Sequence, residues 1–274
     1  MWRWDETLYA GSAEHYARGR FPYPQELAEA LRDELHLDGT GRLLDVGCGP
    51  GPLTLLLAPL FDCAVGVDAD GDMVAEAKRQ AALQGVPNAE FVRLRAEELP
   101  AGLGSFRVAT FAQSFHWMER ERVAAAVREM LEPDSAWVHV NAKTHRGVGD
   151  AVGQGAPAPP HDLIAELVRA YLGPVRRAGR GTLPEGPPGG EEKVMVAAGF
   201  RGPTRLELSG SRVLDRSEDE VVASVYSMTS SAPLLFGKRL AEFDAELRDL
   251  LRRTAPDGRF SERTGEIELV VWRP

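Results

Sequence analysis

The stretch LLDVGCGPGPLTLLL, residues 43–57, places three glycines within five residues between two apolar runs. RLLDV at 42–46 has the composition of a short buried strand. PLTLLLAPL at 52–60 has that of a helix, whose first turn tolerates Pro52. A glycine loop between a strand and a helix lets the backbone pass close to a nucleotide. The spacing therefore predicts a nucleotide-binding turn, although a glycine-rich loop by itself is as often a simple turn.

Strand and helix patterns alternate around this turn as far as residue 143. Further strand patterns lie at 63–70, 88–95, 105–114 and 134–143, and helical patterns lie at 24–37, 72–83 and 120–131. Such alternation with short joints predicts an α/β fold, a doubly wound and mostly parallel sheet with helices on both faces.

Composition narrows the classes of function. The chain has 274 residues, 43% of them hydrophobic and 27% charged, with a formal net charge of −9. That charge argues against a protein that follows nucleic-acid phosphates or an anionic membrane. No apolar run is long enough to span a bilayer, and the N-terminus lacks the apolar core of a secretory signal. Cys48 and Cys63 form no disulfide framework, so we expect a cytoplasmic protein.

The glycine loop can be tested against two common nucleotide motifs. The nicotinamide fingerprint G-x-G-x-x-G needs a third glycine where this chain has Pro52, and no Gly-Lys-Ser/Thr follows for a phosphate loop. Asp68 lies 17 residues after Gly51, at the end of the next strand pattern. A carboxylate there can accept both hydroxyls of a ribose. Its alternative role is to cap the following helix, which Asp70 could do equally well.

Several segments in order resemble the class I S-adenosylmethionine-dependent methyltransferases. LLDVGCGPG resembles their first motif, GVDADGDMVAEA their second-strand segment, AEELP their adenine loop and SFRVATFAQSFHWME their fourth strand and its exit. HYARGRFPYP resembles the lead-in of many small-molecule members, and ELVVWRP fits their last strand. The resemblance covers residues 9–142 and implies a Rossmann-like sheet of seven strands, the last antiparallel. It also implies S-adenosyl-L-methionine as the cofactor.

The resemblance assigns cofactor contacts to the first two motifs. It implies that Gly47, Gly49 and Gly51 line the methionine and ribose part of the cofactor. Asp45 would hold the loop and bind the methionine ammonium, directly or through water. Asp68 would bind the ribose diol.

Further contacts are implied around the adenine. Ala69 and Met73 would flank the ring, and Ala96 and Glu97 occupy the adenine loop. Many members carry Asp just before this Ala-Glu pair, whereas this chain has Arg95, which cannot accept a hydrogen bond. We therefore do not count Arg95 as a ligand, and Glu97 or a backbone carbonyl would accept from the adenine amino group.

The methionine end is assigned to four more residues. Gln113 and His116 would lie beside the methionine moiety, beyond the fourth strand. Tyr16 and Arg20 resemble lead-in residues that close over the cofactor and meet its carboxylate.

The chemistry requires little from the protein beyond alignment. Methyl transfer from a sulfonium is an in-line displacement, which needs a base only when the nucleophile carries a proton. His116 and His145 are the candidate catalytic bases, although His116 could equally be a wall residue stacked by Phe115 and Trp117. No cluster of His, Cys and carboxylates has metal-ligand spacing, so we expect no metal.

Aromatic residues near the N-terminus have three possible roles. Trp2, Trp4 and Tyr9 could cap the substrate pocket, pack on the sheet or contact a second subunit, and packing is the simplest choice. The last role would make the protein a homo-oligomer.

The region after residue 145 contains the expected insertions. Tyr226, Met228 and the pair Leu235 and Phe236 could line an acceptor pocket, and we favour instead the core of a helical lid. The predicted organisation is an N-terminal lead-in or cap (1–40), a Rossmann-like cofactor-binding domain (41–145 and 191–274) and inserted lid or substrate-binding segments (146–190 and 212–262).

The sequence thus predicts a methyltransferase acting on O, N or C of a small, partly apolar molecule, a secondary metabolite by analogy. The alternatives are a non-methylating cyclase or regulator that binds the same cofactor, or an NAD-dependent oxidoreductase.

Overall fold

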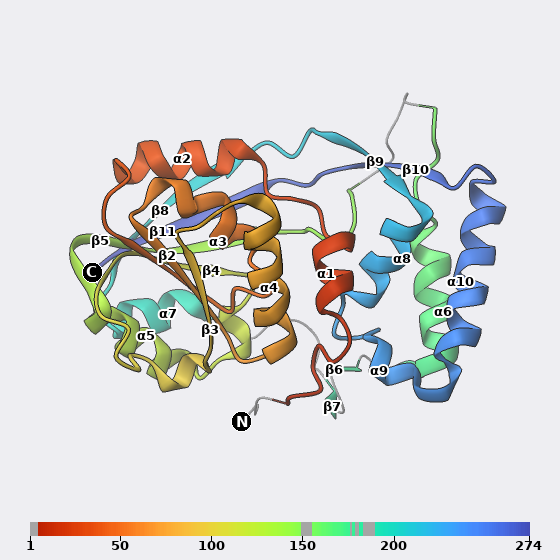
Figure 1. The fold of residues 1–274 in the computed structure, drawn as a ribbon, viewed down its shortest axis with the longest axis horizontal. Coiled ribbons are helices and arrows are strands. Elements are labelled where there is room, and N and C mark those ends of the chain that lie inside the picture. Colours follow the sequence, from red (N-terminus) through yellow and green to blue (C-terminus); the bar gives the residue numbers. More distant parts are fainter. Residues whose placement is uncertain (1–4, 149–154, 176, 179–180, 183–189) are drawn as a thin grey trace.

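The computed structural model describes residues 5–148, 155–175, 177–178, 181–182 and 190–274. Trp2 and Trp4, and with them most of the predicted N-terminal aromatic contact, lie outside this range. Figure 1 shows a sheet flanked by helices on one side of the molecule and a smaller, mainly helical lobe on the other.

Seven strands form one sheet in the order β3-β2-β1-β4-β5-β11-β8. Their bounds are β1 (Arg42–Val46), β2 (Cys63–Asp68), β3 (Ala89–Arg93), β4 (Phe106–Ala112), β5 (Leu131–Ala142), β8 (Arg201–Leu208) and β11 (Ile267–Arg273). Strands β1 to β5 pair in parallel, and β11 runs antiparallel between β5 and β8. The predicted Rossmann-like, mostly parallel sheet with an antiparallel last strand is confirmed.

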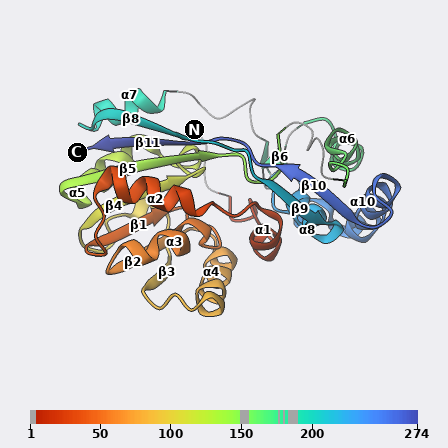
Figure 2. The same ribbon diagram turned by 90° about the horizontal axis from the view of Figure 1, so that it is seen from above.

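Helices cover both faces of this sheet (Figure 2). One face holds α2 (Gln25–Leu35), α3 (Pro52–Leu57) and α4 (Gly71–Gln84), and the other holds α5 (Arg120–Met130) and α7 (Glu191–Ala197). Short 3-10 turns lie at η1 (Ala58–Leu60), η2 (Ala96–Glu98), η3 (Phe115–Trp117) and η4 (Gly237–Arg239). Because both faces are covered, the central strands are apolar on both sides. In β1, Leu43 faces α2 while Leu44 faces α5.

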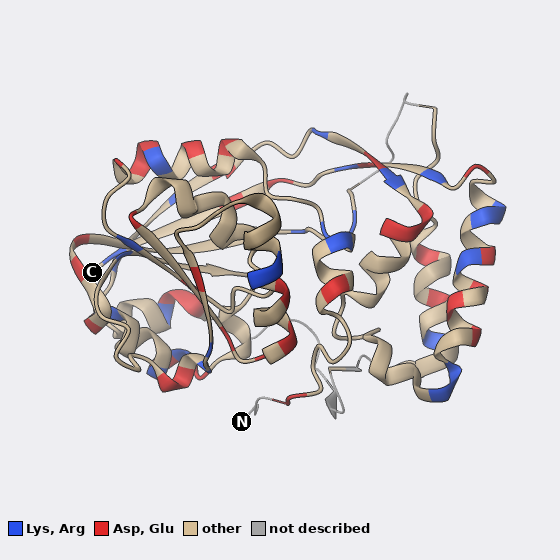
Figure 3. Ribbon diagram, in the orientation of Figure 1, with Lys and Arg blue, Asp and Glu red and all other residues tan. Residues whose placement is uncertain are grey.

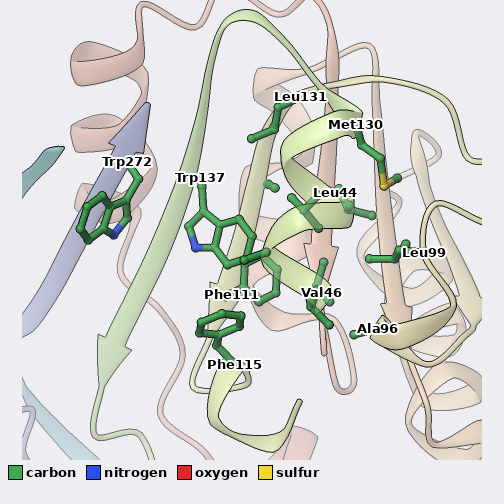
Figure 4. Packing of buried hydrophobic residues seen from close by; sticks show 14 of the residues in the cluster. Leu44, Val46, Ala96, Leu99, Phe111, Phe115, Met130, Leu131, Trp137 and Trp272 are labelled. Carbon is green, nitrogen blue, oxygen red and sulfur yellow. The ribbon is translucent and has the colours of Figure 1, made fainter. Parts of the chain in front are cut away.

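An aromatic cluster fixes the end of β4, where the predicted site begins. Phe111 and Trp137 stack with ring centroids 3.9 Å apart, and the Phe115 ring meets Trp137 edge-on at 5.1 Å. Figure 4 shows these rings converging between β4, β5 and the turn after β4. Stacked and edge-on pairs of this kind add to the free energy of burial. The chain segment between Phe111 and Phe115 is therefore held at both ends.

The lobe is built from the segments that the sequence marks as insertions. It contains α6 (His161–Leu172), α8 (Glu218–Tyr226), α9 (Pro233–Phe236) and α10 (Leu240–Thr254), with β9 (Val213–Ser217) paired to β10 (Arg259–Arg263) and β6 (Arg177–Ala178) paired to β7 (Gly181–Thr182). Its own core includes Phe243, Leu247 and Phe260, all fully buried. In Figure 2 the ribbon β9–β10 continues β8 and β11 out of the sheet. The sequence analysis did not predict β9 or β10.

The N-terminal lead-in joins both halves. Helix α1 (Ala13–Gly19) packs against α8 of the lobe, whereas α2 packs on the sheet. At Gly19 the approach is so close that an added Cβ would lie 2.3 Å from the Ala223 carbonyl carbon. The predicted segment 1–40 is thus divided in the structure between the lobe and the sheet.

Charges of both signs mix along the surface helices, as Figure 3 shows for α2, α4 and α10. Within the part of the chain that the structure describes, no helix combines the length and the apolar character that crossing a bilayer requires.

Candidate active site

The glycine loop turns sharply between β1 and α3 and is fastened to the end of β2. The backbone N–H groups of Gly47 and Cys48 both donate to the Val67 carbonyl, at 2.8 and 3.1 Å. Gly51 has a φ of +81°, and an added Cβ there would lie 2.9 Å from the ring of Phe91. Gly51 therefore lets the loop pack on β3. The loop presents its other glycines to the pocket beyond the strand ends.

A pocket opens at the carboxyl ends of β1, β2, β3 and β4, with about 690 Å³ of empty space that includes its opening to solvent. It is the crevice where open α/β sheets bind their ligands. The lining residues are Tyr9, Tyr16, Gly47, Gly49, Asp68, Ala69, Met73, Leu94, Arg95, Ala96, Glu97, Ala112, Gln113, Ser114, Trp117 and Met118. We call this the cofactor pocket.

Most of the predicted cofactor residues meet there. Nine of them line the pocket: Tyr16, Gly47, Gly49, Asp68, Ala69, Met73, Ala96, Glu97 and Gln113. Arg20, Asp45, Gly51 and His116 do not. Arg95, which the sequence analysis set aside, does line the pocket. The sequence analysis did not select Tyr9 as a cofactor residue, and it missed the wall residues Leu94, Ala112, Ser114, Trp117 and Met118, which carry no motif of their own.

Asp68, the last residue of β2, lies beside the glycine loop. Its Oδ2 accepts from Gly49 N at 2.8 Å and its Oδ1 accepts from Asp70 N at 2.9 Å. Asp70 is the residue that caps α4, since its Oδ1 accepts from the Asp72 and Met73 N–H groups. Each Asp68 oxygen keeps a lone pair for a ligand hydroxyl. Burial raises the pKa of Asp68 to about 6, so the carboxylate is charged at neutral pH.

Asp45 lies behind the loop and has no exposed surface. It accepts from Thr54 Oγ1 at 2.6 Å and from Thr110 Oγ1 at 2.8 Å, which links β1 to α3 and to β4. Burial raises the pKa of Asp45 to about 6, although the two hydroxyl bonds act in the opposite direction. Asp45 therefore holds the elements around the loop, and its predicted contact with the methionine ammonium stays a prediction.

Glu97 fixes the end of the pocket where the resemblance implies the adenine. Glu97 Oε1 accepts from Glu119 N at 3.0 Å, and Arg95 Nε lies 3.4 Å from Glu97 Oε2. The bond to Glu119 joins η2 to the start of α5. Met73 and Leu94 supply apolar walls for a planar ring.

Tyr9 and Tyr16 of the N-terminal lead-in line another side of the cofactor pocket. The Arg20 guanidinium lies 4.4 Å from the centroid of the Tyr16 ring and donates to Ser227 Oγ at 2.8 Å and to Ser227 O at 3.0 Å. The Tyr9 ring meets Tyr16 edge-on at 6.3 Å. Arg20 thus spans from the lead-in to the end of α8, beside the cofactor pocket rather than in its lining.

A second pocket, with about 1030 Å³ of empty space that includes its opening to solvent, shares four lining residues with the cofactor pocket, and we call it the chamber. The shared residues are Tyr9, Tyr16, Gln113 and Trp117. The rest of the lining is Arg20, His116, Asn141, Ala142, Lys143, His145, Met228, Thr229 and Glu266. Gln113, at the junction, has a φ of +54°, a backbone state that non-glycine residues adopt rarely.

Both candidate bases face the chamber. The His116 ring lies 4.8 Å from the Trp117 ring in a tilted rather than stacked arrangement, and His116 also lines the chamber. Burial lowers the pKa of His145 to about 3, with Arg20, Arg146 and Lys143 contributing in the same direction. His145 is neutral at pH 7 but is a weak base.

A third pocket, with about 980 Å³ of empty space that includes open solvent, lies in the lobe, mainly between α6 and α8, and shares His145 and Met228 with the chamber. We call it the lobe pocket. Tyr226 and Phe236 belong to the lobe core, as the lid alternative predicts, whereas Met228 lines both the chamber and the lobe pocket. Among the residues that the structure describes, no group of three or more His, Cys, Asp or Glu could hold a metal ion.

Comparison with known proteins agrees with this geometry. Residues 43–134 match the family described as a methyltransferase domain. The sheet order, the pocket at the strand ends and this match define the class. Residues 43–134 therefore match a methyltransferase domain of the class I, S-adenosylmethionine-dependent type, and the methyl donor of that class is S-adenosylmethionine.

Among individual relatives, the chain is 34% identical over 139 residues to the uncharacterized methyltransferase YcgJ of Bacillus subtilis, a match that covers 50% of this chain and 54% of YcgJ. The chain spans about half the length of the curated relatives it matches.

Two solved structures share the fold. A protein from Anaeromyxobacter dehalogenans described as a type II methyltransferase has a TM-score of 0.52 and 20% identity, covering 92% of this chain and 95% of the other. The [4+2]-cyclase SpnF has a TM-score of 0.51 and 16% identity, covering 98% and 93%.

Proposed function

We propose that this protein transfers the methyl group of S-adenosylmethionine to an O, N or C atom of a small, partly apolar molecule, a secondary metabolite by analogy. The observation that carries the proposal is the continuity of the two pockets. The cofactor pocket and the chamber share Tyr9, Tyr16, Gln113 and Trp117, so a donor in one can face an acceptor in the other.

The residues of this chain act mainly by positioning. Asp68 accepts the ribose hydroxyls, while Gly47 and Gly49 leave room for the ribose and methionine part. Met73 and Leu94 hold the adenine, with Ala96 and Glu97 at its polar edge. When bound, the cofactor supplies a methyl group on a positively charged sulfur. Alignment of the nucleophile with that carbon can lower the barrier by several kcal/mol without acid or base.

The chamber wall offers little basicity near neutral pH at His145, because burial and nearby cations lower its pKa to about 3. His116 and His145 remain the two candidate bases. A nucleophile that is already ionised, or that carries no proton, would need neither.

The lobe supports a small acceptor rather than a macromolecule. Met228 and Thr229 of the lobe and Tyr9 of the lead-in wall the chamber, so the acceptor enters a cavity rather than a flat surface. The net charge of −9 opposes binding to nucleic acid. The two cysteines are free, in keeping with a reducing cytoplasm.

The test is methyl transfer itself. The purified protein is incubated with S-adenosylmethionine labelled in its methyl group and a panel of small acids, phenols, amines and enolisable carbonyl compounds. The expected result is a labelled product and one equivalent of S-adenosylhomocysteine. Failure to bind S-adenosylmethionine at about 1 mM would contradict the proposal, since that concentration is at the top of the usual range.

A non-methylating use of the cofactor is the alternative, and the structural likeness to a cyclase extends to the fold alone. The same assay separates the two. Tight binding of the cofactor with conversion of an acceptor but no S-adenosylhomocysteine would favour the alternative.

A further inference from the structure

The lobe pocket is apolar along most of its wall. Ile164, Val168 and Leu172 line it from α6, and Val225 and Met228 line it from α8 and the turn that follows. Such a surface is suited to a hydrocarbon chain or ring, which gains free energy on leaving water.

Two of the three serines that line this wall, Ser224 and Ser231, use their hydroxyl hydrogens within the lobe. The Ser224 hydroxyl donates to Val221 O at 2.7 Å, and the Ser231 hydroxyl donates to Val225 O at 2.6 Å. Their hydrogen atoms are used within the lobe, so the pocket offers mainly carbon to a ligand.

Positively charged side chains line both the chamber and the lobe pocket. Lys143 lines the chamber, while Arg146 and Arg169 line the lobe pocket. None of the salt bridges between described residues involves these three cations. The described lining of the lobe pocket has no carboxylate, and that of the chamber has one, Glu266.

These cations lie together in a chain whose net charge is −9. Their field reaches His145, which lies where the two pockets meet, because Arg20, Arg146 and Lys143 all lower the pKa of that imidazole. Lys143, Arg146 and Arg169 are solvent-exposed, so water and salt screen part of this field.

We propose that the acceptor is an anionic amphiphile, with an apolar tail in the lobe pocket and an anionic group beside His145, Lys143 and Arg146. The atom that receives the methyl group then lies on the head side, in the chamber next to Gln113 and Trp117. This inference rests on the proposed methyl transfer for the role of the ligand, but the binding preference itself can be measured without turnover.

The first experiment compares three ligands with the same tail. Decanoate, decanol and decylamine are titrated into the full-length protein in the presence of saturating S-adenosylhomocysteine, and binding is followed by calorimetry. Equal tails give equal apolar burial, so the head group alone decides the order. Decanoate is expected to bind at least about tenfold more tightly than decylamine. Equal affinity, or tighter binding of decylamine, would overturn the inference.

Variants then locate the anion and the tail. The double variant K143Q/R146Q should weaken decanoate binding by about tenfold and leave decanol unchanged. A165F, which fills the lobe pocket from α6, should weaken both ligands. The matched control K238Q/R253Q removes the same charge from exposed positions elsewhere on the lobe and should leave both affinities unchanged. Equal loss of decanoate binding in the control and in K143Q/R146Q would show a non-specific charge effect and contradict the site.

Calorimetry with S-adenosylhomocysteine alone separates this inference from the proposed function. Cofactor binding together with equal affinity for the three ligands would reject the anionic acceptor and leave the methyltransferase proposal intact. A preference for decanoate without cofactor binding would support the site for an anionic ligand and contradict the methyltransferase proposal.

Discussion

At the scale of single residues, two carboxylates at the ends of neighbouring strands share a raised pKa and face different surroundings. Asp68 ends β2 at the pocket and accepts from two backbone N–H groups, whereas Asp45 in β1 is enclosed by two threonine hydroxyls. The sequence indicated the ribose role of Asp68 from its distance to the glycine loop. It could not show that Asp45 accepts hydrogen bonds from Thr54 and Thr110, because these residues meet only in the folded sheet.

Replacing Asp68 with Asn should lower the affinity for S-adenosylhomocysteine by about 10- to 100-fold, because two charge-assisted hydrogen bonds are weakened. The wild-type affinity should fall as the pH drops below about 6, where Asp68 takes up a proton, and the variant should lack this pH dependence. Calorimetry between pH 5 and 8 measures both effects. Asp72→Asn, at an exposed position in the first turn of α4, is the control and should bind as the wild type does.

The variant Asp45→Asn tests how much the buried Asp45 carboxylate lowers the free energy of unfolding when it is charged. The folded-state pKa of about 6 exceeds the ordinary value of 3.8, so the contribution of Asp45 to stability is greatest below pH 4 and is lost as the pH rises through 6. Asn does not titrate. The free energy of unfolding of the variant, relative to wild type, should therefore rise by about 2–3 kcal/mol between pH 4 and 8. Urea unfolding at both pH values tests this, and a difference independent of pH would contradict the raised pKa.

At the scale of elements, the sequence predicted the repeating helices and strands of the sheet because each has a clear apolar period. It did not predict α1, β9 or β10. Helix α1 is only seven residues long, and β9 and β10 form a polar ribbon that takes its shape from pairing with each other. Gly51 was assigned to the cofactor with the other loop glycines, since spacing alone cannot show which glycine faces the strand behind.

Gly51→Ala separates packing from ligand binding. An added methyl group there meets both a left-handed backbone and the Phe91 ring, so we expect a loss of about 2–4 kcal/mol in the free energy of unfolding. Gly85→Ala is the matched control, with a φ of +65° and nothing within 4 Å of the new Cβ, and should cost about 1–2 kcal/mol. Denaturant unfolding gives both values. Equal losses would show that the contact with Phe91 carries no weight.

Gly19→Ala tests the contact between α1 and α8. The new Cβ would overlap the backbone at Ala223, so the two helices must move apart, at a cost of about 1–3 kcal/mol. Because Tyr16 and Met228 wall the chamber from these two sides, the KM for an acceptor should rise more than that for S-adenosylmethionine. Gly71→Ala, where the nearest atom is 3.5 Å away, should change neither constant. A rise in KM confined to the cofactor would contradict this role.

At the scale of the whole molecule, the strand order and the location of the cofactor pocket followed from the order of the motifs, because parallel α/β sheets place their ligands at the carboxyl ends of strands. The chamber and the lobe pocket could not be predicted from the order of the motifs. The chamber combines the motif segments of the lead-in and of the turn after β4 with the segment after β5 and the turn after α8, and the lobe pocket lies mainly between α6 and α8, so both depend on elements that are distant in sequence. The acceptor chemistry is therefore a property of tertiary packing.

The central claim is that the crevice at the strand ends binds the nucleoside of S-adenosylmethionine, and calorimetric titration with S-adenosylhomocysteine tests it most directly. We expect a single site with a Kd on the order of 1–100 μM, and no measurable binding of NAD up to about 1 mM. Absence of binding by S-adenosylhomocysteine, or equal binding of NAD, would contradict the account.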